Sequence, residues 1–150
     1  MNEVHYFGYG SNLYPSQMRD RCPSAEEVGV GVLHDHRLTF FGRSRGWDGG
    51  GVADVEACWG DSVQGVIYRM SPVDILALDT YENTYARVQS TVVMEGQELN
   101  AWVYRRLPRF CRRPPSPRYL ATLAYGYGAR GFELDRLLGA ADPAAYFPDP

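Results

Sequence analysis

The stretch that best combines polar groups with loop geometry is Gly10-Ser11-Asn12, which follows the aromatic run Tyr6-Phe7-Gly8-Tyr9. Aromatic residues favour strands, and a glycine lets the backbone turn tightly and approach a ligand. The amides of Ser11, Asn12 and Leu13 would then be free to point at an anion or a carbonyl oxygen. The same pattern also fits an ordinary strand, turn and short helix that bind nothing.

A second reactive group, the carboxylate of Glu82, is expected at the end of a helix. The segment Ser71-Pro72-Val73-Asp74 is a helix-start signal, with Ser as N-cap and Pro at the first helical position. Apolar residues then recur at helical spacing from Ile75 onward, which predicts a helix that ends at or just before Glu82. A carboxylate there can exchange protons with a ligand, although many such residues are simply solvated.

The histidines and cysteines give no such signal. His34 and His36 flank one Asp, but this pattern is more typical of an exposed turn than of a metal site, and we predict no metal. The three cysteines are widely separated, without C-x-x-C spacing, so neither a disulfide framework nor a zinc site is indicated. We expect reduced, mostly buried thiols at Cys22, Cys58 and Cys111.

The charge balance argues against an anionic partner surface. The net charge is −3 and all 15 basic residues are Arg, so neither nucleic acid nor a membrane is an expected partner. One Arg-rich, Pro-rich segment, residues 105–118, stands out. We predict a solvated irregular loop there, with a site for an anionic substrate tail, a phosphate or an acidic carrier protein as the alternative.

The elements that position these groups read as an α+β fold. Six or so short strands are predicted, mostly antiparallel because their connections are short. The first is the run that begins at Tyr6, and residues 28–33 and 37–41 follow with a break at His34-Asp35-His36. Residues 52–59 and 63–70 are joined by a hairpin turn at Gly60-Asp61-Ser62, and a second hairpin over 87–104 turns at Glu95-Gly96. Residues 42–51 predict a flexible loop that could cover a pocket. Two or three helices are added, one capped by Ser116-Pro117 and ending at residues 126–128, and a last one over 132–138. This pattern indicates a small, mostly antiparallel β-barrel with flanking helices.

The 150 residues are expected to form a single domain, 1–150. No stretch is apolar enough to span a bilayer, and the N-terminus lacks the pattern of a signal peptide. We therefore expect a cytoplasmic protein, monomeric or homodimeric, with a loosely held tail over residues 142–150.

Three motifs in order resemble the γ-glutamylcyclotransferase family, related to the AIG2-like γ-glutamylamine cyclotransferases. They are Tyr9-Gly10-Ser11-Asn12-Leu13, Leu78-Asp79-x-x-Glu82 and Pro114-Pro115-Ser116-Pro117-x-Tyr119. The glycine run 49–51 and the strand after it also look like that family, so the resemblance covers nearly the whole chain. It implies a cyclotransferase barrel and no cofactor, with a small γ-glutamyl compound as the substrate.

The resemblance also implies roles for individual residues. Glu82 would be the catalytic acid/base, and the loop Tyr9-Gly10-Ser11-Asn12-Leu13 would bind the glutamyl group. Tyr119 would line the pocket, with a plain core tyrosine as the alternative. Tyr85 is a weaker match, because the family has its pocket tyrosine about six residues after the catalytic Glu, and Asn83 replaces the glycine that commonly follows that Glu.

The implied reaction closes 5-oxoproline by attack of the substrate's α-amine on its own γ-carbonyl, which expels an amino acid or amine. One carboxylate suffices as base and then acid. The pKa of Glu82 should then lie above that of an ordinary glutamate. Two branches stay open: γ-glutamyl amino acids or peptides, and a γ-glutamyl cap on a secondary metabolite. The hypothesis from another class is a binding module without turnover on the same fold.

Overall fold

The structure, a computed structural model, describes residues 2–146. Five strands close into a barrel in the order β1-β3-β2-β4-β5, with bounds β1 Val4–Gly8, β2 Glu26–Ser44, β3 Gly50–Met70, β4 Tyr85–Met94 and β5 Gln97–Arg106. The pairs are antiparallel except for β1 with β5, which is parallel. The α+β barrel expected from the sequence is confirmed, with five strands where six or so were predicted.

The difference in strand count comes from the two long strands β2 and β3. The sequence predicted a break at His34-Asp35-His36 and a hairpin turn at Gly60-Asp61-Ser62, and both predictions are wrong. The two segments lie opposite each other in one continuous ribbon, where the register shifts between His34 and His36. Asp35 and Gly60 take positive φ angles of 59° and 83°, and Gly60 N donates to Asp35 Oδ1 at 3.0 Å. These residues therefore form an irregular bulge, which uses the same residue types as a turn.

The loop at the other end of this ribbon is shorter than expected. Residues 42–51 were predicted as a flexible loop of about ten residues. Instead β2 runs to Ser44 and β3 begins at Gly50, with one short 3-10 helix, Arg45–Trp47, at the tip. The ribbon thus carries Trp47 to a fixed position, where its ring lies 4.8 Å from that of Tyr119.

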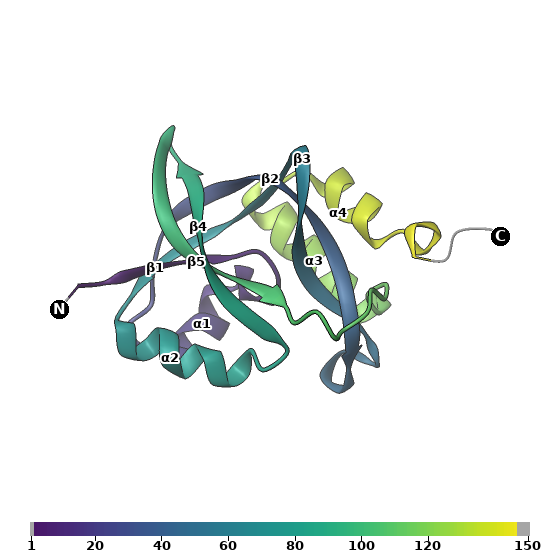
Figure 1. The fold of residues 1–150 in the computed structure, drawn as a ribbon, viewed down its shortest axis with the longest axis horizontal. Coiled ribbons are helices and arrows are strands. Elements are labelled where there is room, and N and C mark those ends of the chain that lie inside the picture. Colours follow the sequence, from purple (N-terminus) through teal and green to yellow (C-terminus); the bar gives the residue numbers. More distant parts are fainter. Residues whose placement is uncertain (1, 147–150) are drawn as a thin grey trace.

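Within the described residues, four α-helices flank the barrel: α1 Pro15–Arg21, α2 Pro72–Tyr81, α3 Pro117–Arg130 and α4 Leu134–Ala141. Figure 1 shows α1 and α2 together beneath one part of the barrel, and α3 and α4 together on the other side. The predicted N-caps are confirmed, since Ser71 Oγ accepts from Asp74 N and Ser116 Oγ accepts from Tyr119 N, both at 3.2 Å. These caps fix the starts of the helices that carry Glu82 and Tyr119.

The last two helices end later than predicted. Helix α3 does not stop at residues 126–128 but continues to a left-handed cap at Gly131, with φ 71°. A Cβ at Gly126 would lie 3.3 Å from the Leu13 side chain. The glycine is thus a site of close helix packing rather than a helix end. Helix α4 begins at Leu134, two residues after the predicted start.

The Arg-rich segment 105–118 begins in the last two residues of β5 and is tied to the barrel, so it is not a freely solvated loop. Arg106 pairs with Asp54 and Glu56, both at 3.2 Å, and Arg112 also pairs with Glu56. At Gly51, N donates to Pro114 O at 3.0 Å, and a Cβ would lie 2.0 Å from Arg113 O. The glycine run thus lets the segment pack against the start of β3.

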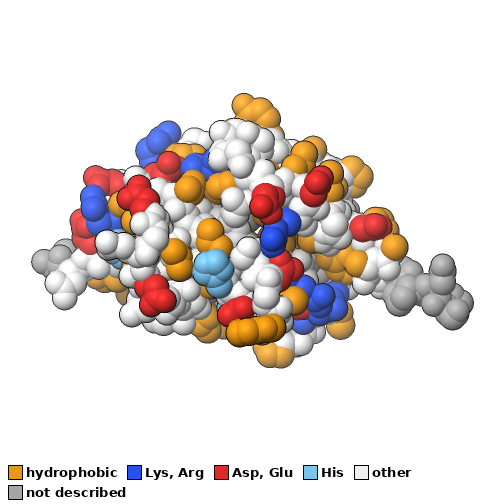
Figure 2. Space-filling model, turned by 90° about the horizontal axis from the view of Figure 1, so that it is seen from above, with side chains coloured by type: hydrophobic (Ala, Val, Ile, Leu, Met, Phe, Trp, Pro, Cys, Tyr) orange, Lys and Arg blue, Asp and Glu red, His pale blue; other side chains and the backbone are white. Residues whose placement is uncertain are grey.

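The surface mixes charges of both signs. On the face in Figure 2, acidic and Arg side chains lie next to one another among apolar ones. Of the cysteines, Cys22 is buried, Cys58 is half-buried and Cys111 is exposed, so the expectation of mostly buried thiols is wrong for Cys111. Among residues 2–146, no helix is long and apolar enough to cross a membrane.

The tail is anchored at its beginning. Tyr146 accepts from Phe40 N at 3.0 Å and donates to Ala140 O at 2.8 Å. The prediction of a loosely held tail is thus wrong for residues 142–146. Residues 147–150 lie outside the described part of the chain.

Candidate active site

Glu82 caps the C-terminal end of α2 and turns its side chain inward, where it is 13 % exposed. Asn12 Nδ2 donates to Glu82 Oε1 at 3.2 Å. The guanidinium of Arg21, at the end of α1, lies 3.5 Å from the same oxygen. The two motifs that the sequence places 70 residues apart therefore meet at one buried carboxylate.

The loop between β1 and α1 forms a 3-10 turn over Ser11–Leu13. Leu13 N donates to Gly10 O at 3.0 Å, so its amide is not free as expected, and the Leu13 side chain is buried in the core. Among the described residues, the amides of Ser11 and Asn12 have no acceptor. A Cβ at Gly10 would lie 3.3 Å from both Ala53 Cβ and Tyr119 Oη. The loop thus offers two amides, not three, and a larger residue at position 10 would crowd Ala53 and Tyr119.

Tyrosines form the walls around this carboxylate. Tyr119 accepts a hydrogen bond from Ala53 N at 3.0 Å, and Tyr85 donates to Ala53 O at 2.6 Å. Both rings are thereby fixed to the same residue of β3, Ala53. Tyr9, buried on the other side, donates to Tyr104 O at 2.5 Å. Tyr85 thus reaches the site despite the shortened connection after Glu82, because it is the first residue of β4.

A cavity joins these groups. Its narrow part, a hollow of about 30 Å³, is lined by residues from the loop, the strands and α3, namely Tyr6, Tyr9, Gly10, Ser11, Asn12, Ala53, Glu82, Tyr85, Tyr104 and Tyr119. Four of them, Ser11, Glu82, Tyr85 and Tyr119, also line an outer hollow of about 390 Å³. Glu82 therefore lies where the wide part meets the narrow part. Leu13 does not line either part.

Burial sets the electrostatics of the site. It raises the pKa of Glu82, while the Asn12 hydrogen bond and the Arg21 charge oppose that rise. The direction agrees with the expectation from the sequence. Burial also raises the pKa of Tyr9 and Tyr119 well above the ordinary tyrosine value, so these hydroxyls are neutral hydrogen-bonding groups near neutral pH.

Arg21 was not expected at the site from the sequence, because a single Arg on a short helix carries no local signal. Asp79 belongs to a motif, but no role was predicted for it. It accepts from Tyr104 Oη at 2.6 Å and from Arg87 Nε at 2.9 Å. Asp79 thus holds the end of α2, next to Glu82, against β4 and β5.

Comparisons with known proteins agree with this arrangement. Residues 6–121 match the model of the family described as "Gamma-glutamyl cyclotransferase, AIG2-like". The chain belongs to this γ-glutamyl cyclotransferase family. It is similar to γ-glutamylcyclotransferases from Bos taurus and Homo sapiens, at 32 % and 33 % identity over 94 % of this chain and 80 % of each relative.

Solved structures of similar proteins show the same fold. One, described as a γ-glutamyl cyclotransferase, has a TM-score of 0.82 at 28 % identity and covers 94 % of this chain and 88 % of that one. A human protein described as uncharacterized has a TM-score of 0.84 at 29 % identity, over 99 % and 94 % of the two chains. The cyclotransferase motifs thus lie on a cyclotransferase barrel.

Proposed function

We propose that this protein is a cofactor-independent γ-glutamyl cyclotransferase that converts a small γ-glutamyl compound to 5-oxoproline. The observation that carries the proposal is the Glu82 carboxylate, buried at the junction of the two parts of the cavity with the unbonded amides of Ser11 and Asn12 beside it. Membership of a family of γ-glutamyl cyclotransferases supports the same reaction.

Each bond change has a group nearby. The substrate's α-amine is protonated near neutral pH, so Glu82 takes one proton as base. The amine nitrogen then bonds to the γ-carbonyl carbon, and the amides of Ser11 and Asn12 stabilise the negative charge on its oxygen. When the bond to the leaving nitrogen breaks, the protonated Glu82 gives its proton to that nitrogen. The attacking nitrogen also loses its second proton as the ring forms, and the released amine takes up one proton near neutral pH, so no net proton is consumed overall.

The tyrosines and Gly10 complete the proposed glutamyl site. Tyr9, Tyr85 and Tyr119 are neutral, and their hydroxyls are held by the backbone. They confine the flexible glutamyl chain so that its amine approaches its own carbonyl, which is a large part of the work in an intramolecular closure. Leu13 contributes through the core, since its side chain packs against α3 at Gly126.

The outer hollow favours one substrate branch. Arg43 and Arg45 line it, and neither has an ion pair within residues 2–146. Glu82 is the one acid among the described lining residues. Guanidinium groups pair well with carboxylates. The leaving group is therefore proposed to carry a carboxylate, as in γ-glutamyl amino acids and peptides, rather than to be a neutral amine.

The test is 5-oxoproline release from γ-glutamyl-alanine and from the matching γ-glutamyl-ethylamide. Wild type should release it, faster from the alanine compound, and Glu82→Gln should lower the rate by at least ~10²-fold, the lower end of acid/base contributions. Release by neither protein would favour a binding module, and equal rates on the two compounds would contradict the proposed role of Arg43 and Arg45.

Three further expectations remain proposals of the same kind. The chain acts as a single domain over residues 1–150, it works in the cytoplasm, and it is a monomer or homodimer. Fractionation of the cells that express the protein tests its location, and sedimentation of the purified protein tests its oligomeric state.

A further inference from the structure

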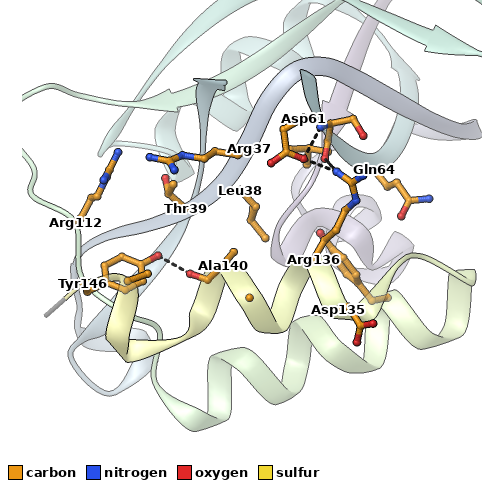
Figure 3. Close-up of a pocket in the computed structure, with 15 residues that line it drawn as sticks. Arg37, Leu38, Thr39, Asp61, Gln64, Arg112, Asp135, Arg136, Ala140 and Tyr146 are labelled. Carbon is orange, nitrogen blue, oxygen red and sulfur yellow. Dashed lines mark hydrogen bonds and ion pairs between the residues drawn. The ribbon is translucent and has the colours of Figure 1, made fainter. Parts of the chain in front are cut away.

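A second groove lies between α4 and the ribbon of β2 and β3. Its volume is about 310 Å³, and it shares no lining residue with the cavity around Glu82. Figure 3 shows its two ends: Arg37 and Arg112 at one, and Asp61, Asp135 and Arg136 at the other. The cyclotransferase reaction proposed above uses none of these residues.

One end carries an excess of positive charge. In Figure 3 the guanidinium ends of Arg37 and Arg112 lie on the same side of the groove. Both pair with Glu56, Arg37 at 3.6 Å, and Arg106 pairs with the same carboxylate at 3.2 Å. Asp54, bound to Arg106, is the other acid of this network. Three guanidinium groups therefore share two carboxylates, and the Arg37 side chain remains 44 % exposed.

The floor at this end holds an unpartnered polar group. Thr39 is 6 % exposed, and its hydroxyl has no hydrogen-bond partner among residues 2–146. Thr39 and Arg37 are two residues apart on β2, so their side chains share one face of the strand. A buried hydroxyl without a partner is uncommon and costs stability. A ligand atom that accepts from Thr39 and from Arg37 would remove that cost.

The other end carries an excess of negative charge. Arg136 pairs with Asp61 and with Glu133, so one cation is shared by two acids. Asp135 adds a third carboxylate, and it has no ion pair within the described part of the chain. This end therefore favours a cation.

We propose that this groove binds a small zwitterion of the amino-acid or dipeptide class. The carboxylate lies on Arg37, Arg112 and Thr39, and the ammonium group lies on Asp61 and Asp135. The spacing fits: Arg37 and His34, which pairs with Ser62, are three positions apart on β2. That is at most roughly 10 Å at ~3.3 Å per residue, because the bulge at Asp35 shortens the strand. An extended dipeptide spans about 7 Å, which leaves room for hydrogen bonds at both ends.

The binding test uses the full chain and calorimetric titration with L-alanyl-L-alanine, its N-acetyl form and its C-terminal amide. The zwitterion should bind, and each blocked form should bind about tenfold more weakly, because each lacks one charge-assisted contact. Arg37→Gln should lower the affinity for the zwitterion by roughly tenfold for the same reason. Arg109→Gln, outside the groove, and Arg43→Gln, in the mouth of the other cavity, should leave its affinity unchanged.

The Thr39→Val variant distinguishes two explanations of the unpartnered hydroxyl, a ligand contact and a packing defect. If the hydroxyl serves a ligand, the valine variant remains folded but loses affinity for L-alanyl-L-alanine by several-fold. If that variant becomes more stable and binds as wild type does, the proposed role of Thr39 is refuted. The proposal is overturned if the dipeptide gives no binding, or if Arg43→Gln abolishes binding that Arg37→Gln leaves intact. None of these outcomes depends on whether the protein releases 5-oxoproline.

Discussion

Replacing Arg21 by Gln should shift the pH dependence of turnover. Within residues 2–146, Arg21 is the one cation that forms an ion pair with Glu82, at 3.5 Å. If the charge centres are ~5 Å apart, their attraction is about 0.8 kcal/mol at a dielectric constant of ~80 and about 3.3 kcal/mol at ~20. Arg21 is 25 % exposed, so water screens the pair and the lower part of this range applies. One pKa unit corresponds to ~1.4 kcal/mol, so the pKa of Glu82 should rise by about one unit.

The assay is kcat/KM for 5-oxoproline release as a function of pH. Glu82 must be ionised to act as base, so the acid limb of the profile should move upward by about one pH unit in Arg21→Gln. The rate on the alkaline side should stay close to that of wild type. Arg21→Lys keeps the charge and should restore most of the limb. Arg19→Gln is the matched control, because Arg19 is exposed on the same helix and does not line the cavity.

One result would refute this reasoning. If Arg21→Gln lowers the rate equally at every pH and leaves the acid limb in place, Arg21 does not act through the ionisation of Glu82. Its role would then be to hold Asn12, whose Oδ1 accepts from Arg21 Nη1 at 3.4 Å, or to contact the substrate.

Other expected outcomes concern stability and positioning. Burial raises the pKa of Glu82 in the folded protein, so the free energy of unfolding falls as pH rises from the pKa of the unfolded state through that of the folded state. Because Gln stays neutral, Glu82→Gln should raise the Tm at pH 7.5 and leave it nearly unchanged at pH 4. Gly51→Ala places a Cβ 2.0 Å from Arg113 O and should cost about 1–3 kcal/mol in chemical denaturation. Gly139→Ala, in open space on α4, should add roughly 0.5–1 kcal/mol, and loss of stability there would contradict the contact argument. Asp79→Asn should lower kcat more than it raises KM, because it loosens the end of α2 without touching the substrate; unchanged kinetics would remove Asp79 from a positioning role.

The fold class could be predicted because most elements have local signals. Ser71-Pro72 and Ser116-Pro117 begin helices, and Glu95-Gly96 turns the hairpin of β4 and β5, as the structure confirms. The strand count could not be predicted, because the bulge at Asp35 and Gly60 uses the residues of a turn. Whether the chain reverses there depends on which segments pair, and that is decided by the closed barrel rather than by local sequence.

The candidate site could be predicted in part, because some of its residues belong to local sequence motifs. Glu82, Asn12 and Tyr119 belong to motifs, and the structure brings them together. Arg21 carries no motif signal, because its role depends on α1 packing beside α2. Leu13 belongs to a motif but lies in the core, and only its contact with Gly126 shows why its size and position fit there.

Most motif positions in this chain shape the cavity without touching it. Asp79 accepts hydrogen bonds from Tyr104 and Arg87 and so fixes the end of α2, from which the Glu82 side chain turns inward. Gly50 and Gly51 admit the segment Pro114-Pro115, which leads into the helix that carries Tyr119. A proton-transfer group must lie within hydrogen-bond reach of its substrate, so small shifts in these supports change the rate as much as loss of a contact does. Presence of the whole motif set is therefore better support for turnover than presence of Glu82 alone, because a binding module would need the tyrosine walls but not a carboxylate held this closely.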